Sequence, residues 1–277
     1  MIQYSIKRGF TLIELSIVLV ILGLLVGGVL IGKDLIKVAE YRTVIAQRQE
    51  FDAALNAFKG KYGNYLPGDM PAATARKFGF FDFNIGSNGS AGGYGMGDND
   101  GFLVMGEDFI FWRQLSEARL IKGNYGMDAS NPLDPSTGVP TINPSDRLDP
   151  FLPKLKMGGA YFHAMAWDFF YEDGDSCIEC FNAFGIVTTL DGWGQAFTPQ
   201  EAFYFDSKMD DSKPNTGKII SDPSWNLTPL TGVCNYSGTS AFDRKALYNI
   251  NSSAGGDTKA CFLYIGIQYF IKIIRLY

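Results

Sequence analysis

The sequence offers few of the residues that enzymes use for catalysis. Its 277 residues include a single histidine, His163, which excludes metal sites built from several histidines and weakens any Ser-His-Asp arrangement. Neither a Gly-x-Ser-x-Gly motif nor a phosphate-binding loop is present. His163 stands in the apolar segment AYFHAMAW, so we expect a core histidine and not a catalytic base. The composition favours a non-enzymatic protein.

Basic residues are also scarce. Lys and Arg number 24 against 29 Asp and Glu, which gives a formal net charge of −5. A surface that binds nucleic acid needs a basic face to neutralise the phosphates. Scattered acidity of this kind predicts that nucleic acid is not a partner.

What the sequence does contain is one long apolar run. Across residues 10–32 the only charged residue is Glu14, and a run of about 18 or more apolar residues predicts a transmembrane helix. Lys7 and Arg8 precede the run, which predicts a cytoplasmic N-terminus and a C-terminus outside. A secretory signal peptide would have a shorter run and then a small-residue cleavage site. No such site follows Gly32, so we expect the span to be retained.

Glu14 is costly at this position. Insertion scales give a carboxylate at the centre of a membrane helix a penalty of about 2.5–3.5 kcal/mol. One interpretation is a glutamate that is tolerated because it reaches the cytoplasmic interface. The other is that Glu14 pairs with a cation inside an assembly, where the two charges neutralise each other.

The residues around Glu14 resemble a known motif. The string KRGFTLIEL is similar to the processing motif of type IV pilins and type II secretion pseudopilins. The resemblance implies that a prepilin peptidase cuts after Gly9 and methylates the new N-terminal amine of Phe10. It also implies that Glu14 pairs with the N-terminal amine of a neighbouring subunit. The likeness is close over about the first 50 residues, so it identifies a class of assembly and not a particular machine.

The resemblance implies a structural subunit of a type IV pilus or a type II secretion pseudopilus. The size of the head and its long loops favour a minor subunit over the main filament protein. Its expected partners are prepilin peptidase, other pilin or pseudopilin subunits, the inner-membrane assembly platform and membrane lipid. We expect a single-pass protein of the bacterial inner membrane with a periplasmic head, which moves into the pilus or pseudopilus on assembly. Two alternatives from other classes are a membrane-anchored periplasmic binding protein and an anchored thiol oxidoreductase that uses Cys177 and Cys180.

A second helical pattern follows the apolar run. Apolar residues recur mostly three or four positions apart, at Leu35, Val38, Tyr41, Ile45, Phe51, Leu55, Phe58 and Tyr62. This spacing predicts an amphipathic helix with one apolar stripe and with Gln47 and Arg48 largely off it. The two segments form either one continuous helix or two helices hinged at Gly27-Gly28 or Gly32.

The remaining chain predicts one head domain. We divide the sequence into a leader peptide (1–9), a transmembrane helix (10–32), its amphipathic continuation (33–61) and a globular head (62–277). Residues 84–101 are rich in glycine and residues 128–153 in proline, which predicts long loops. The expected fold class is α+β, with the long N-terminal helix packed on an antiparallel sheet.

Several shorter elements of the head can be predicted. Helices are expected in residues 107–123, closed by Gly123, and in residues 199–209, where Thr198, Pro199 and Glu201 form a capping-box signature. The strand candidates are residues 160–167, 184–190 and 261–267.

The four cysteines, Cys177, Cys180, Cys234 and Cys261, all lie in the part expected outside the cytoplasm, where thiols are oxidised. We favour one disulfide between Cys234 and Cys261 and a second, local one between Cys177 and Cys180. A redox dithiol in DSCIEC is one alternative, although no thioredoxin-like βαβ pattern surrounds it. A zinc site is another, although one histidine adds little to two cysteines.

Calcium is the one ion that the acidic loops suggest. The segment GDNDG sets Asp98 and Asp100 two residues apart before a glycine, which resembles half of a calcium loop but lacks the distal glutamate. A second candidate is the turn with Asp210 and Asp211. We expect no other cofactor.

Overall fold

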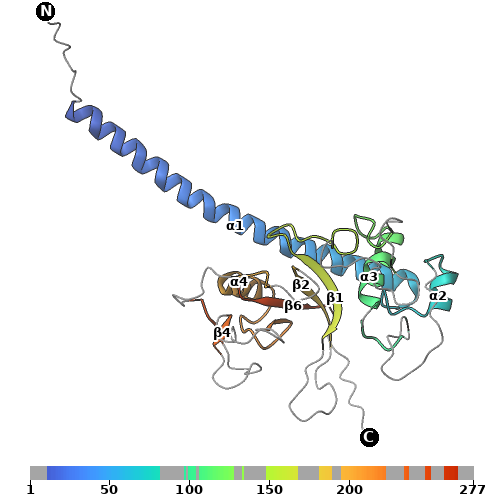
Figure 1. Cartoon of the computed structure of the whole chain (residues 1–277). Coiled ribbons are helices and arrows are strands. Elements are labelled where there is room, and N and C mark those ends of the chain that lie inside the picture. Colours follow the sequence, from blue (N-terminus) through green and yellow to red (C-terminus); the bar gives the residue numbers. More distant parts are fainter. Residues whose placement is uncertain are drawn as a thin grey trace, which may run out of the picture.

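The computed structural model describes residues 11–81, 97, 99–103, 106–127, 133, 148–167, 181–188, 195–222, 234–236, 247–250 and 259–267. Its largest element is α1 (Leu12–Tyr62), a helix of 51 residues. The N-terminal half of α1 projects away from the head, and its C-terminal half lies against the head (Figure 1). The helix runs through all the glycines proposed as hinges, so the chain forms one continuous helix and not two.

The C-terminal end of α1 follows from its sequence. Gly63 adopts a left-handed conformation with φ 83°, and its N–H group donates to the carbonyl of Lys59. The N–H of Asn64 bonds the same carbonyl at 2.8 Å. A glycine at this position ends a helix at little cost because it has no Cβ to clash.

The C-terminal half of α1 buries one face. Its buried residues are Val44, Gln47, Phe51, Ala54, Leu55, Phe58 and Tyr62. The predicted stripe is correct from Phe51 onward, and its earlier members Tyr41 and Ile45 are partly buried against the same core. Leu35, in contrast, is 66% exposed, because it precedes the point where the head begins. The interpretation of Gln47 as lying off the stripe is wrong: its side-chain amide donates to the carbonyl of Lys154 at 2.8 Å and accepts from the N–H of Lys156 at 3.2 Å.

A four-stranded antiparallel sheet forms the centre of the head. Its strands are β1 (Tyr161–Trp167), β2 (Phe181–Val187), β3 (Ile219–Asp222) and β6 (Phe262–Gly266), in the order β1-β2-β6-β3. The three predicted strands correspond to β1, β2 and β6, although β2 begins three residues before the predicted boundary. Every residue of β2 and β6 is buried. The α+β class, with the long helix packed on an antiparallel sheet, is confirmed.

Helix α3 (Glu107–Glu117) packs between α1 and β1. Its predicted extension to Gly123 is wrong, because Arg119 takes a left-handed conformation with φ 57°. The N–H of Leu120 bonds the carbonyl of Leu115 and the N–H of Arg119 bonds that of Ser116. These two bonds form a Schellman motif, which ends the helix without a glycine.

The other elements lie around this core. Helix α4 (Pro199–Met209) has the predicted capping box, since Thr198 and Glu201 exchange side-chain and backbone hydrogen bonds. The sequence did not predict α2 (Ala72–Lys77), or the short ribbon of β4 (Asn235–Tyr236) and β5 (Leu247–Tyr248). The predicted loops 84–101 and 128–153 lie mostly outside the described residues.

Aromatic rings join the helix to the sheet. The ring of Phe51 in α1 lies 4.9 Å from that of Trp112 in α3, 5.2 Å from Phe162 in β1 and 5.9 Å from Phe184 in β2. Such aromatic pairs contribute about 0.5–1.5 kcal/mol each beyond the burial of apolar area. Phe51 therefore connects α1 both to α3 and to the sheet.

Candidate functional site

The N-terminal end of α1 is built around Thr11 and Glu14. Thr11 is the N-cap residue, and its hydroxyl oxygen accepts a hydrogen bond from the N–H of Glu14 at 3.3 Å. In return, Oε2 of Glu14 accepts from the N–H and from the hydroxyl of Thr11, each at 2.8 Å. This reciprocal arrangement is a capping box. It satisfies backbone donors at a helix end that lies in apolar surroundings.

Sequence reasoning missed this part of the function of Glu14. The signal was available, because Thr-x-x-Glu directly before an apolar run is the pattern of a capping box. The sequence interpretation considered Glu14 only as an interfacial residue or as an assembly residue. It did not include the hydrogen bonds by which Glu14 caps the N-terminus of its own helix. Any mutation of Glu14 changes the cap as well as the charge.

Glu14 is surrounded by exposed apolar side chains. Leu12 is 87% exposed, Ile13 66% and Leu15 54%. Among the described residues Glu14 has no cationic partner, since its hydrogen bonds are those with Thr11. Gly9 and Phe10, the predicted cleavage and methylation residues, lie outside the described residues. The geometry thus presents a carboxylate on an apolar helix surface, where a cation from another molecule would gain from pairing with it.

The apolar half of α1 meets the requirements for a membrane span. It is the one helix among the described residues that is long and apolar enough to cross a membrane. None of its most apolar window is buried inside the structure. This apolar half also overlaps a segment that matches a known protein family. Residues 5–30 match the model of the prokaryotic N-terminal methylation motif.

The chain carries the N-terminal methylation motif of type IV pilins and pseudopilins. The comparison with curated proteins and the comparison with solved structures each gave no match. Together with the single apolar helix, the motif supports a pilin-like or pseudopilin-like subunit and a single-pass membrane anchor.

One of the two predicted disulfides is present. Cys234 and Cys261 are bonded, with their Cα atoms 5.1 Å apart, and both residues are fully buried. Cys261 directly precedes β6, and the backbone of Cys234 accepts a bond from the N–H of Asn249 beyond β5. The disulfide therefore ties the β4-β5 ribbon to the sheet. Cys177 and Cys180 lie outside the described residues, so their bond remains a prediction.

The acidic turn after α4 gathers three carboxylates. Oxygen atoms of Asp206, Asp210 and Asp211 all lie within 4.8 Å of one another. Asp206 was not among the predicted ligands, and it is fully buried. It accepts hydrogen bonds from the hydroxyl of Tyr248 at 2.9 Å and from the N–H of Ser212 at 3.0 Å.

Burial dominates the protonation of this turn. Burial raises the pKa of Asp206 to about 7, and the charges of Asp211 and Asp210 act in the same direction, although the hydrogen bonds from Tyr248 and Ser212 oppose them. Asp210 is held by the backbone N–H groups of Lys218 and Ile219. The chain's own donors thus account for the positions of these carboxylates, and calcium binding here remains a prediction.

The other calcium candidate is only partly described. Asp98 lies outside the described residues, and Oδ1 of Asp100 accepts from the N–H of Phe102 at 2.8 Å. The N–H of Gly101 donates to Asp69 at 2.9 Å, so the loop is fastened to the segment between α1 and α2. Calcium binding by Asp98 and Asp100 stays a prediction.

The single histidine is a core residue, as predicted. His163 is 4% exposed, and its Nε2 lies 2.7 Å from Oδ2 of Asp108. Oδ1 of Asp108 accepts from the N–H groups of Gly106 and Phe109 at 2.8 and 2.9 Å. Asp108 therefore positions the first turn of α3 against β1.

Proposed function

We propose that this protein is a structural, non-enzymatic subunit of a type IV pilus or a type II secretion pseudopilus. In this proposal prepilin peptidase removes residues 1–9 and methylates the amine of Phe10. The subunit then waits in the bacterial inner membrane with its head in the periplasm, and the assembly platform passes it into a filament. The large head beyond residue 62 supports a minor subunit over the main filament protein.

One observation carries the proposal: a carboxylate stands at the start of a long helix whose apolar half has no partner within the head. Alone in the membrane, Glu14 has only its cap to Thr11. In an assembly, the positively charged amine of a neighbour's Phe10 would neutralise it. Removing one member of a buried ion pair commonly costs about 3–5 kcal/mol, because the other charge is left unpaired.

The capping box provides matched variants that separate the two contributions of Glu14. Glu14→Leu removes both the cap and the charge. Glu14→Gln removes the charge and keeps an amide that can complete the capping box. Thr11→Val keeps the charge and removes the hydroxyl that takes part in the cap.

The first test is assembly of each variant as the only copy in the cell. We expect Glu14→Leu and Glu14→Gln to insert in the membrane and to lose residues 1–9, but to be absent from purified filaments. Thr11→Val should enter filaments at close to the wild-type level. The readouts are membrane fractionation, the mass of the mature N-terminus and immunodetection in sheared filaments.

Two results would contradict the proposal. If Glu14→Gln assembles like wild type, the cap and not the charge is what assembly needs. A mature N-terminus beyond Gly32 would show ordinary secretion and would remove the basis for a filament subunit.

A further inference from the structure

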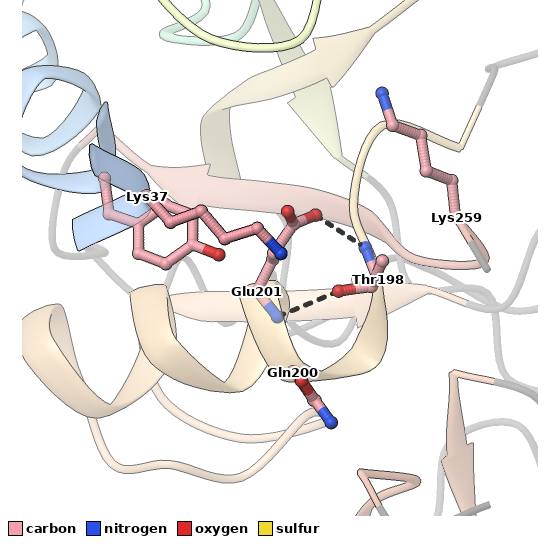
Figure 2. Close-up of a pocket in the computed structure, with 6 residues that line it drawn as sticks. Lys37, Thr198, Gln200, Glu201 and Lys259 are labelled. Carbon is pink, nitrogen blue, oxygen red and sulfur yellow. Dashed lines mark hydrogen bonds between the residues drawn. The ribbon is translucent and has the colours of Figure 1, made fainter. Parts of the chain in front are cut away.

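A polar pocket lies where α1 meets the start of α4. It has a volume of about 460 Å³ and is lined by Lys37, Tyr41, Thr198, Gln200, Glu201 and Lys259. Pockets for small ligands span about 300–1,000 Å³. Figure 2 shows Lys37 extending from α1 over Glu201, with Lys259 on the far side of Thr198.

The pocket lies where α1 leaves its apolar half. Lys37 directly follows Leu35 and Ile36, the last large apolar residues of α1 that are mostly exposed. A bilayer core of about 30 Å is crossed by about 20 helical residues. If the span begins near Glu14, it ends within about one helical turn of Lys37. The pocket then opens at the level of the lipid headgroups.

The charges of the pocket are two cations and one anion. Lys37 and Lys259 are exposed, and within the described part of the chain neither ammonium group has an ion pair. Glu201 supplies the anion; its Oε2 accepts from the N–H of Thr198 at 3.0 Å. Burial and the charge of Glu201 raise the pKa of Tyr41 to about 12, so its hydroxyl keeps its proton.

This distribution complements a zwitterion that carries a phosphate and an ammonium group. We propose that the pocket binds the phosphoethanolamine headgroup of a phospholipid, with Lys37 and Lys259 at the phosphate and Glu201 at the ammonium. The proposal rests on the proposed function, because it needs α1 to be the anchor and the head to lie outside the cytoplasm. Bound lipid would hold the head at the membrane surface until the subunit enters a filament.

Lipid retention by the full-length chain tests this inference. The chain is released from detergent micelles containing equal amounts of phosphatidylethanolamine and phosphatidylglycerol, and retained lipids are identified by native mass spectrometry. Wild type should retain phosphatidylethanolamine preferentially. Lys37→Ala/Lys259→Ala should retain at least about tenfold less, a change that corresponds to about 1.4 kcal/mol.

Two further variants make the test specific. Glu201→Gln keeps a side chain that can complete the capping box of α4 and removes the anion, so the preference should shift toward phosphatidylglycerol. Lys33→Ala, on the same helix but outside the pocket, should behave like wild type. Equal loss in Lys33→Ala and in the double variant, or a wild-type preference for phosphatidylglycerol, would show general attraction of lysines to anionic lipid and overturn the proposal.

Flotation with lipid vesicles separates this inference from the proposed function. A chain that floats with vesicles but shows no dependence on Lys37 and Lys259 contradicts the headgroup site alone. A chain that does not float contradicts the membrane anchor, and the headgroup site fails with it.

Discussion

The two halves of α1 share one backbone geometry but differ in what surrounds them. Large apolar residues in residues 12–36 point in all directions and are 48–87% exposed. In residues 44–62 the apolar residues form one face, and Phe51 and Phe58 on that face are 5% and 0% exposed. A helix that is apolar all round is stable only in lipid or among other helices, whereas an amphipathic one packs on a single side.

The comparison shows that only the second half of α1 is stabilised by packing within this chain. Each large side chain that the second half buries contributes about 1.5–3 kcal/mol. The first half buries nothing against the head, so lipid or neighbouring subunits must supply its stabilisation. The glycines reinforce this difference, because an added Cβ at Gly23, Gly27, Gly28 or Gly32 would meet nothing within 4 Å. The head therefore does not require glycine at these positions.

Truncating one side chain in each half gives the sharpest test of this contrast. Phe51→Ala removes the ring that contacts α3, β1 and β2, and we expect it to destabilise the head by about 3–5 kcal/mol. Leu24→Ala, at a side chain that is 73% exposed, should leave head stability within about 0.5 kcal/mol of wild type. Denaturant unfolding of the full-length chain in detergent, followed by tryptophan fluorescence, measures both.

Equal effects of the two substitutions would mean that residues 12–36 pack against the head in solution. Phe51→Ala keeps the whole apolar half of α1, so it should still insert in the membrane. Loss of insertion in this variant would contradict the view that the two halves are stabilised independently. The expected result is an unstable head on an intact anchor.

Local patterns were enough to predict the apolar helix, the α4 cap and three of the four strands of the central sheet, with β3 missed. Each of these depends on residues that are near in sequence: an uninterrupted apolar run, Thr-Pro-x-Glu, or a short β-branched and aromatic segment. The motif at Glu14 was recognised for the same reason. Its capping contribution, which was missed, depends on an equally local signal, Thr11 three residues before Glu14.

The failures involve contacts between distant segments. Gln47 is buried because the backbone of Lys154 and Lys156 needs its amide. Asn182 is a poor strand former by propensity, yet it lies in β2, where its side chain bonds the backbone of Gly101 and Leu103. The hydrophobic periodicity around Gln47 or Asn182 does not indicate a hydrogen-bond partner about 80 to 110 residues away. The pairing of Cys234 with Cys261 was predicted correctly, because a bond between them was expected to tie the last strand to the head.

Removing the disulfide should also affect the head and not the anchor. Cys234→Ser/Cys261→Ser opens a loop with a sequence separation of 27, for which chain entropy predicts a loss of about 3–4 kcal/mol. We expect a lower melting temperature in detergent with unchanged insertion and cleavage after Gly9. A double variant that melts like wild type would show that the packing around β6 holds the ribbon without the bond.

The smallest expected effect is a pH dependence confined to the head. In the folded state burial raises the pKa of Asp206 from its ordinary value of 3.8 to about 7. Between these two values the folded chain binds a proton that the unfolded chain releases, so stability falls as the pH rises through about 7. The melting temperature of wild type should therefore be lower by a few degrees at about pH 8 than at about pH 5.5.

Two amide variants isolate this contribution. Asp206→Asn cannot ionise, so its melting temperature should change less with pH than that of wild type. Asp211→Asn, at an exposed residue of the same turn, should keep most of the dependence. The helical signal of α1 should be unaffected by pH in all three proteins, because Asp206 lies in α4 and acts on the head alone. If Asp206→Asn shows the wild-type slope, other groups of the head are responsible, and the carboxyl of Asp206 does not titrate between about pH 5.5 and pH 8.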